Sequence, residues 1–462
     1  MKKSVSVLVV AILFCLMLVP QGVYDSNYRI SNSRQYLISD STPHDEIVIT
    51  HNDNFTTQGW EGNGTVDDPF IISNLEIKSD TTCVNISNTD VYFVVENCWM
   101  MSDSVSWSGF GIFLNSVQNG EIRDVIITRK EVGVSSFGTS DTTFSNITIY
   151  NSGLGILLDQ STNCYIVNST IMENSEGSAI TLLDSDHCDI IHNHLQGNRV
   201  GFLSNSSEWM EVTNNTIVGN SEYGIQTTSG TKKLSAYWNW IGWNGQNAID
   251  NGSTKFWDNG NYGNWWSDGD NESDYFVPGS ANAKDRHPQA WNDTMGPDIN
   301  IQLTQSESAG EFSVHVYVEA IDDVAVSQVI LSTSLDNGST WSNVTMDWSY
   351  DSWTASVDDL SAGSIIHYVV YASDYASNWE VTSDEEYTIL LETDSTTTSS
   401  TTGTDTTTVP TSGTGTNTIT GPGGDIPGID PLAIAAIIGV AAAIGIVAFL
   451  MYQYPSKFGR NK

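Results

Sequence analysis

Positively charged side chains are scarce in this chain. Its 462 residues include 17 Lys and Arg against 55 Asp and Glu, which gives a formal net charge of -38 at pH 7. Nucleic-acid binding depends on a basic surface, so this composition argues against a nucleic-acid partner. The expected surface is acidic, self-repelling and soluble.

Catalytic motifs are also missing. An inverting glycosidase needs two carboxylates about 6.5–9.5 Å apart. Asn88-Thr89-Asp90 is similar to one polygalacturonase motif, but the companion aspartate pair and the Gly-His-Gly and Arg-x-Lys motifs are not found at useful positions. Asp159 and Asp184 occupy similar turn sites and stay open as a carboxylate pair, although solvated turn aspartates are the commoner case. The sequence therefore assigns no catalytic residue.

Long apolar runs lie at the two ends of the chain. Two lysines precede a short apolar core, so residues 1–23 are predicted to be a secretory signal peptide. Pro431–Tyr452 holds no charged residue and is 22 residues long, which suffices for one membrane helix at about 1.5 Å per residue. The basic tail 453–462 follows it. This order predicts a single-pass protein of the cell membrane with a cytoplasmic tail and an extracellular remainder.

The middle of the chain repeats with a period near 23 residues. A small residue followed by an apolar one recurs in steps of 22, 22, 24, 22, 23 and 24. Its members are Gly111-Ile112, Gly133-Val134, Gly155-Ile156, Ala179-Ile180, Gly201-Phe202, Gly224-Ile225 and Ala248-Ile249. A second, apolar register comprises Ile127, Ile149, Ile171, Leu195, Ile217 and Ile241. A third, polar register comprises Asn151, Asn174, Asn198, Asn220 and Asn244.

This period predicts a right-handed parallel β-helix, an all-β solenoid. The repeats are rich in Val, Ile and Thr and broken by Asn, Ser and Gly, as in short strands joined by tight turns. Three strands and three turns fill one coil, and coils stack about 4.8 Å apart. Equivalent residues then form ladders, apolar inside and amide-bonded at the turns. We expect the β-helix over 69–260, between caps at 24–68 and 261–295.

The pattern changes after the second cap. Alternating apolar residues in "FSVHVYVEAI" and the turn in "SLDNGSTW" predict an immunoglobulin- or fibronectin-III-like β-sandwich over 296–391. This region holds no cysteine, so an inter-sheet disulfide is excluded. Residues 392–430 are dominated by Thr, Ser and Gly, which predicts an extended stalk before the membrane helix at 431–452.

Three segments carry a resemblance to a known family. They are "GNGTVDDPFII", "NSTIMENSEGSAI" and the closing "WDNGNYGNWWSD", of which the last is the most specific. Over about residues 45–290 the chain resembles the NosD-like right-handed parallel β-helix proteins, within the carbohydrate-binding and sugar-hydrolase β-helix superfamily. Together with the sandwich, stalk and anchor it is similar to archaeal cell-surface proteins. The resemblance implies copper-site maturation in the periplasm, or the binding or cleavage of polysaccharides, but no catalytic motif transfers.

Two stretches hold candidate metal ligands. "DSDHCDIIHNH" contains His187, His192 and His194, but it aligns with the preceding coil without an insertion. The three imidazoles are then expected to point in different directions, so copper or zinc binding is the weaker reading. "SDGDNESD" offers Asp268, Asp270 and Asp274 as Ca²⁺ ligands, with a solvated acidic loop as the alternative.

Cysteines and sequons complete the candidate sites. Cys164 and Cys188 occupy the same inward position in adjacent coils, within disulfide range, with stacked free thiols as the alternative. Candidate N-glycosylation sites are Asn54, Asn63, Asn146, Asn168, Asn205, Asn337 and Asn343.

The aromatic residues near the last coils suit either sugar stacking or packing of the cap. They are Trp238, Trp240, Trp243, Trp257, Trp265 and Trp266. The sequence favours a surface protein that binds glycans or has a structural role. A polysaccharide lyase or hydrolase is the first alternative, and a copper-handling protein is the second.

Overall fold

The computed structural model describes residues 41–390, except residues 105, 106, 255, 272, 309, 323, 350 and 351. The predicted signal peptide, stalk, membrane helix and cytoplasmic tail lie outside the described residues. Within the described residues, no helix is both long and apolar enough to cross a membrane. All the described residues belong to one compact unit, Met1–Gly403. The second unit of the chain is Thr404–Lys462.

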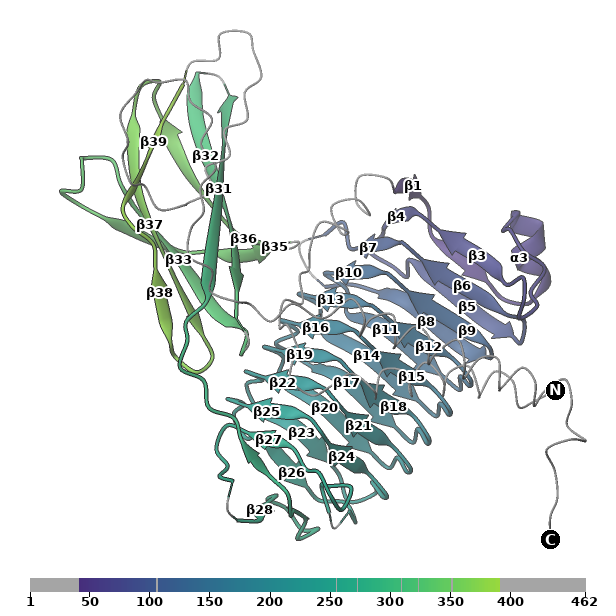
Figure 1. Ribbon diagram of the computed structural model, residues 1–462. Helices are drawn as coiled ribbons and strands as arrows, with labels where there is room; N and C mark the ends of the chain where they lie inside the picture. Colours follow the sequence, from purple (N-terminus) through teal and green to yellow (C-terminus); the bar gives the residue numbers. More distant parts are fainter. Residues whose placement is uncertain are drawn as a thin grey trace, which may run out of the picture. The chain divides into compact units, whose positions relative to one another are not determined.

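The first part of the described chain is a parallel β-helix made of three sheets (Figure 1). The 11-stranded first sheet contains β1 (Thr42–His44), β4 (Leu75–Lys78), β7 (Trp99–Met101), β10 (Ile126–Thr128), β13 (Thr148–Tyr150), β16 (Thr170–Met172), β19 (His194–Gln196), β22 (Thr216–Val218), β25 (Trp240–Gly242), β27 (Trp265–Trp266) and β30 (Gln289–Ala290). The 9-stranded second sheet contains β2 (Ile47–Ile49), β5 (Val84–Thr89), β8 (Phe110–Val117), β11 (Val132–Phe137), β14 (Leu154–Asp159), β17 (Ser178–Leu183), β20 (Val200–Asn205), β23 (Tyr223–Thr227) and β26 (Ala248–Asp250). The 8-stranded third sheet contains β3 (Phe70–Ser73), β6 (Phe93–Glu96), β9 (Gly120–Arg123), β12 (Thr143–Ser145), β15 (Tyr165–Val167), β18 (Asp189–Ile191), β21 (Glu211–Thr213) and β24 (Ser235–Tyr237).

The repeat seen in the sequence is the pairing register of these sheets. Ile149 pairs with Ile127 in the preceding coil and with Ile171 in the next, and all three side chains are fully buried. The small residue of the first register leads into each second-sheet strand. A Cβ on Gly155 would lie 2.2 Å from the Ala179 carbonyl oxygen, so the coils approach too closely for a side chain there. The predicted parallel β-helix is confirmed.

Both ends of the β-helix extend beyond the predicted limits. β1 and β2 already pair in the first and second sheets before residue 69, and the short helix α3 (Asp53–Gln58) buries Phe55 against this end of the core. At the other end, β27 and β30 continue the first sheet past residue 260. A small antiparallel pair, β28 (Tyr275–Phe276) with β29 (Lys284–Asp285), completes the C-terminal cap.

Two buried amide ladders run along the turns of the coils. In one, the Asn198 backbone N–H and side-chain Nδ2 donate to Asn220 Oδ1 at 3.0 and 3.1 Å, and Asn220 donates likewise to Asn244. This ladder begins at Ser152, whereas the predicted member Asn151 is an exposed turn residue with φ 48°. The prediction was wrong at that position because Asn151 lies 23 residues before Asn174, while the true step is 22.

The second ladder was not predicted. It comprises Ser169, Asn193, Asn215, Asn239 and Asn264, and it ends on the carboxylate of Asp285. Asp285 is fully buried and accepts hydrogen bonds from the Asn264 backbone N–H at 2.7 Å and from Trp266 Nε1 at 3.0 Å. Burial raises the pKa of Asp285, although these donors favour its charged form. The Asp285 carboxyl group thus lies at the end toward which every amide in the ladder donates.

The Asn215→Ala variant tests the ladder. Asn215 Oδ1 accepts from the Asn193 N–H at 2.8 Å, and Asn215 Nδ2 donates to the Ile190 carbonyl oxygen at 2.8 Å. Because the substitution leaves buried groups unpaired, we expect the free energy of unfolding to fall by about 2–3 kcal/mol in denaturant melts. The control, Ser235→Ala on the exposed side of β24, should change it by less than about 0.5 kcal/mol. Equal effects would contradict the proposed importance of the ladder.

The remaining described residues form an antiparallel β-sandwich. One sheet contains β31 (Asp298–Ser308), β32 (Glu311–Ile321), β36 (Ser352–Leu360) and β35 (Asp347–Ser349). The other contains β34 (Ser342–Thr345), β33 (Val326–Ser334), β37 (Ile365–Asp374), β38 (Trp379–Val381) and β39 (Glu385–Thr388). The alternating residues Val314, Val316 and Val318 of β32 face the core and are at most 1% exposed. This confirms the predicted alternation.

Candidate functional site

A cavity of about 510 Å³ lies at the C-terminal end of the β-helix, within the size range of about 300–1,000 Å³ typical of ligand pockets. We call it the cap pocket. Trp238, Tyr262 and Trp265 supply its aromatic surface, and Arg286 and His287 lie among its polar residues. The pocket therefore combines ring faces with hydrogen-bonding groups.

Trp238 stands at a strained turn position. It has φ 57°, at the turn that follows the third-sheet strand of each coil, where the preceding coils carry residues such as Asn168 and Asn214. Asparagine adopts this conformation more readily than tryptophan does, and Trp209 and Trp243 also have a positive φ in this protein. Its ring lies 5.3 Å from that of Tyr262, which is 56% exposed. The half-buried Trp238 and the exposed Tyr262 thus form an aromatic pair at the pocket.

Five of the six tryptophans of this region divide into two groups, and the sixth, Trp243, packs edge-on against Trp291. Trp257 and Trp266 are fully buried in the cap, where their Nε1 atoms donate to buried carboxylates. Trp238 and Trp265 line the cap pocket, and Trp240 stacks on Trp265 with a centroid distance of 4.5 Å. Cap packing and an exposed aromatic surface, which were alternatives from the sequence, are therefore both present.

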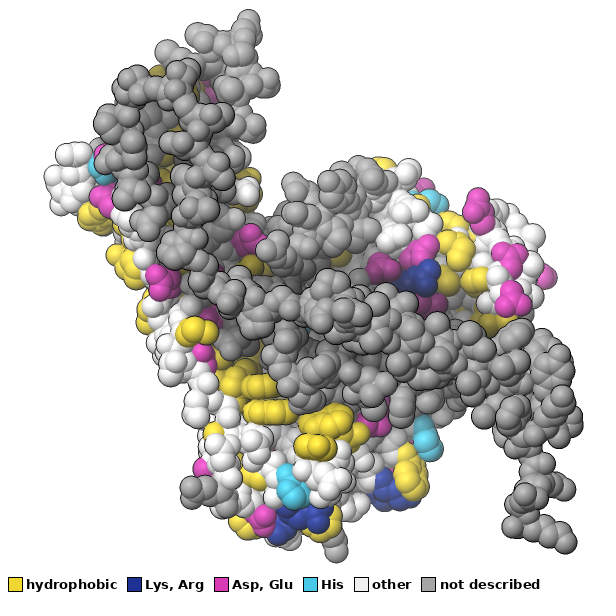
Figure 2. Space-filling model, in the orientation of Figure 1, with side chains coloured by type: hydrophobic (Ala, Val, Ile, Leu, Met, Phe, Trp, Pro, Cys, Tyr) yellow, Lys and Arg dark blue, Asp and Glu magenta, His cyan; other side chains and the backbone are white. Residues whose placement is uncertain are grey.

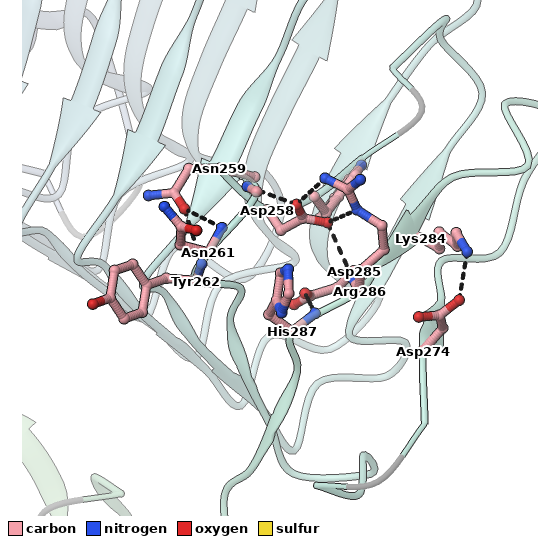
Figure 3. Close-up of polar contacts among 12 residues, drawn as sticks. Asp258, Asn259, Asn261, Tyr262, Asp274, Lys284, Asp285, Arg286 and His287 are labelled. Carbon is pink, nitrogen blue, oxygen red and sulfur yellow. Dashed lines mark hydrogen bonds and ion pairs between the residues drawn. The ribbon is translucent and has the colours of Figure 1, made fainter.

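Each cation of the cap is held by a carboxylate (Figure 3). Arg286 Nε donates to Asp258 Oδ2 at 2.9 Å, and the guanidinium lies over the Phe256 ring at 3.9 Å. Burial alone would raise the pKa of Asp258, but hydrogen bonds from Arg286 and Gly260 lower it below its ordinary value. Sequence reasoning missed these residues, because ion pairs between residues 28 apart leave no local signal.

The candidate histidines occupy three separate places. His187 is exposed at a turn and stacks on Trp209 at 6.0 Å. His192 lies at the next turn, and His194 on β19 is 2.9 Å from Gln196 Oε1 through its Nε2. Burial lowers the pKa of both His192 and His194. The structure does not bring the three rings together.

The three aspartates of the acidic loop also bind separate partners. Asp268 Oδ1 accepts from Asn247 Nδ2 at 2.6 Å, Asp270 accepts from Ser273 at 2.9 Å, and Asp274 pairs with Lys284. The three carboxylates do not form one ligand set.

A different carboxylate group could hold a metal ion. Among the described residues, the one set of three candidate ligand atoms mutually within 4.8 Å comes from Asp293, Asp322 and Asp374, at the start of the sandwich and on its edge. Burial and the neighbouring Asp293 raise the pKa of Asp374, while Asn378 donates to both of these carboxylates. Such oxygen donors suit Ca²⁺. Sequence analysis did not identify these three aspartates as a group because they come from distant segments of the chain.

Cys164 and Cys188 lie in adjacent coils as predicted, because their neighbours Tyr165 and Asp189 are paired. Both are free, buried thiols in the structure. The disulfide stays a prediction. Of the candidate sequons, Asn54 is half-buried and six are exposed, namely Asn63, Asn146, Asn168, Asn205, Asn337 and Asn343. Their glycosylation also stays a prediction.

The β-helix matches a known family. Residues 61–271 match the sequence profile of the family described as periplasmic copper-binding protein (NosD). The β-helix of this chain is NosD-like. This confirms the resemblance inferred from the coil and cap motifs. No curated protein matches the chain.

Several solved structures are similar to the chain at low identity. An alginate lyase from Paenibacillus sp. str. FPU-7 is 14% identical, with 54% of this chain and 95% of that chain covered and a TM-score of 0.32. Pectate lyase Pel9A is 12% identical, with 57% and 82% covered and a TM-score of 0.28. The periplasmic alginate epimerase AlgG is 10% identical, with 46% and 83% covered and a TM-score of 0.23. Similarity of this extent identifies no activity.

The candidate histidines and the paired-coil cysteines of the NosD-like region do not form a copper site. Copper favours imidazole and sulfur donors that converge on one point. His187, His192 and His194 do not converge, and Cys164 and Cys188 are buried in the core.

Asp189 predicts a pH dependence of stability. Burial, followed by the neighbouring Glu211, raises its pKa from 3.8 to about 6, so the folded protein holds this proton more tightly than the unfolded chain. The resulting stabilisation is complete below 3.8 and is lost as the pH rises through about 6, up to about 3 kcal/mol. Asp189→Asn should flatten this part of the stability profile in urea melts. Asp184→Asn, at an exposed turn of the same coil, should leave it in place.

The burial of the cysteines predicts that they react slowly with thiol reagents. Burial raises the pKa of Cys83 to about 11 and that of Cys98 to about 12, and both Cys164 and burial raise the pKa of Cys188. We expect the four described cysteines of the native protein to resist maleimide labelling, since few of their thiols ionise and all four are buried. Mass spectrometry after unfolding without reductant then decides the disulfide. Linked Cys164–Cys188 peptides support it, and alkylated ones reject it.

Proposed function

We propose that this protein is an extracellular glycan-binding protein whose binding site is the cap pocket. The observation that carries the proposal is the aromatic pair of the half-buried Trp238 and the exposed Tyr262, which lines a cavity of about 510 Å³. Aromatic faces bind the apolar faces of sugar rings, and neighbouring amides and hydroxyls bind their hydroxyl groups. The periplasmic description of the NosD family is consistent with an extracellular location.

We further infer that the protein is anchored to the cell membrane. Residues 431–452 would form the single membrane helix, and residues 392–430 would hold the β-helix away from the surface. In this arrangement the cap pocket would be available to polysaccharides outside the cell. Protease treatment of intact cells, with antibodies to both ends, would test the orientation.

Binding should depend on the aromatic pair. We expect Trp238→Ala and Tyr262→Ala each to weaken binding to the glycans retained on an array by about ten-fold or more, because each removes one stacking face. Trp209→Ala is a matched control, since Trp209 also has a positive φ, at 61°, and is 52% exposed outside the pocket.

The same assay separates the alternatives. Release of unsaturated or reducing ends from a bound polysaccharide would replace binding with lyase or hydrolase activity. An equal loss of binding in the Trp209 variant would exclude the cap pocket as the site.

A further inference from the structure

We propose that the cap pocket selects uncharged polysaccharide chains and rejects polyanionic ones such as uronates. This inference rests on the proposed glycan-binding function and adds the chemical class of the ligand. It separates the protein from binders of acidic glycans, in which Arg or Lys side chains are free to pair with sugar carboxylates.

The guanidinium of Arg286 is already neutralised. Its Nε and Nη2 atoms bind the two oxygens of Asp258, whose side chain is fully buried, and the Arg286 backbone N–H donates to the same carboxylate at 3.0 Å. The Phe256 ring covers the guanidinium plane. A sugar carboxylate would therefore have to displace a preformed bidentate pair to reach Arg286.

The second cation is also paired. Lys284 Nζ contacts Asp274 Oδ2 at 2.5 Å, and Asp274 itself lines the pocket. His287 is the remaining basic lining residue. Among the described residues of the cap, a sugar carboxylate thus meets no unpaired Lys or Arg side chain.

The electrostatic field of the whole acidic chain also disfavours polyanionic ligands. The net charge is -38, and no Lys or Arg occurs between Arg286 and Lys457. Among the side chains that Figure 2 colours, Lys and Arg form only a few small groups. A polyanion would approach against this charge, whereas a neutral chain would not. Neutral groups remain for recognition, since Asn261 and Gln289 are exposed at the pocket beside the aromatic pair.

A matched pair of polymers tests the selection. Fully methyl-esterified homogalacturonan and polygalacturonate share one backbone and differ in the carboxylate charge. Affinity electrophoresis or calorimetry would use the full chain from a host without N-glycosylation, at neutral pH and in EDTA, so that no Ca²⁺ bridges acidic groups. We expect the ester to bind at least about ten-fold more tightly than the acid. Equal or tighter binding of polygalacturonate overturns the selection and leaves glycan binding intact.

A wider array separates the two proposals. It would hold neutral hexose polymers together with uronate and sulfate polymers. Retention of neutral members alone supports both proposals, and retention of anionic members alone overturns only the charge selection. Binding to no member overturns the proposed function itself.

The Asp258→Asn variant tests whether the paired charges cause the rejection of polyanions. It leaves the Arg286 charge unbalanced, so we expect polygalacturonate binding to rise by about five-fold at low salt, with binding of the ester unchanged. The double variant Asp258→Asn with Arg286→Gln is the matched control and should show no gain. Should the first variant not fold, Asp274→Asn frees Lys284 in the same way. No gain in any folded variant would show that paired charges do not set the selection.

Discussion

The stacking of parallel coils at strand spacing is the constraint on which the rest of this structure depends. Each turn lies directly over the same turn of the next coil, so a buried polar group there has one neighbour that can satisfy it. Asparagine meets this need in both directions, since Asn215 donates to Asn239 and accepts from Asn193. The two amide ladders therefore hold the coils in one register along the solenoid.

A ladder of this kind needs a group that accepts its last donors. In this protein that group also positions residues of the candidate site. Asp285 accepts the final donors of the second ladder and also accepts from the His287 backbone N–H at 2.9 Å. The buried Trp266 donates to the same carboxylate. Because Asp285 is fixed in this way, Arg286 and His287 leave the core at a set position beside Trp238. The cap pocket is thus a consequence of how the ladder terminates.

The basic side chains of the cap are paired with carboxylates. Arg286 with Asp258 and Lys284 with Asp274 are local pairs within a strongly acidic chain. Pairs with exposed partners contribute little stability on their own. Their larger effect is on recognition, since a neutralised cation does not attract an acidic ligand.

The sequence by itself determined the all-β class, the coil period and the inward apolar registers, because a solenoid repeats its local environment at a fixed spacing. It also placed Cys164 and Cys188 in adjacent coils, and it erred at Asn151, which lies one residue before the true ladder position Ser152. Tertiary structure alone decided which tryptophans are buried and which are exposed, and which acids meet, as Asp293, Asp322 and Asp374 do. The physical reason is that the cap and the sandwich do not repeat. Their contacts join segments of unrelated sequence, and no period relates one partner to the other.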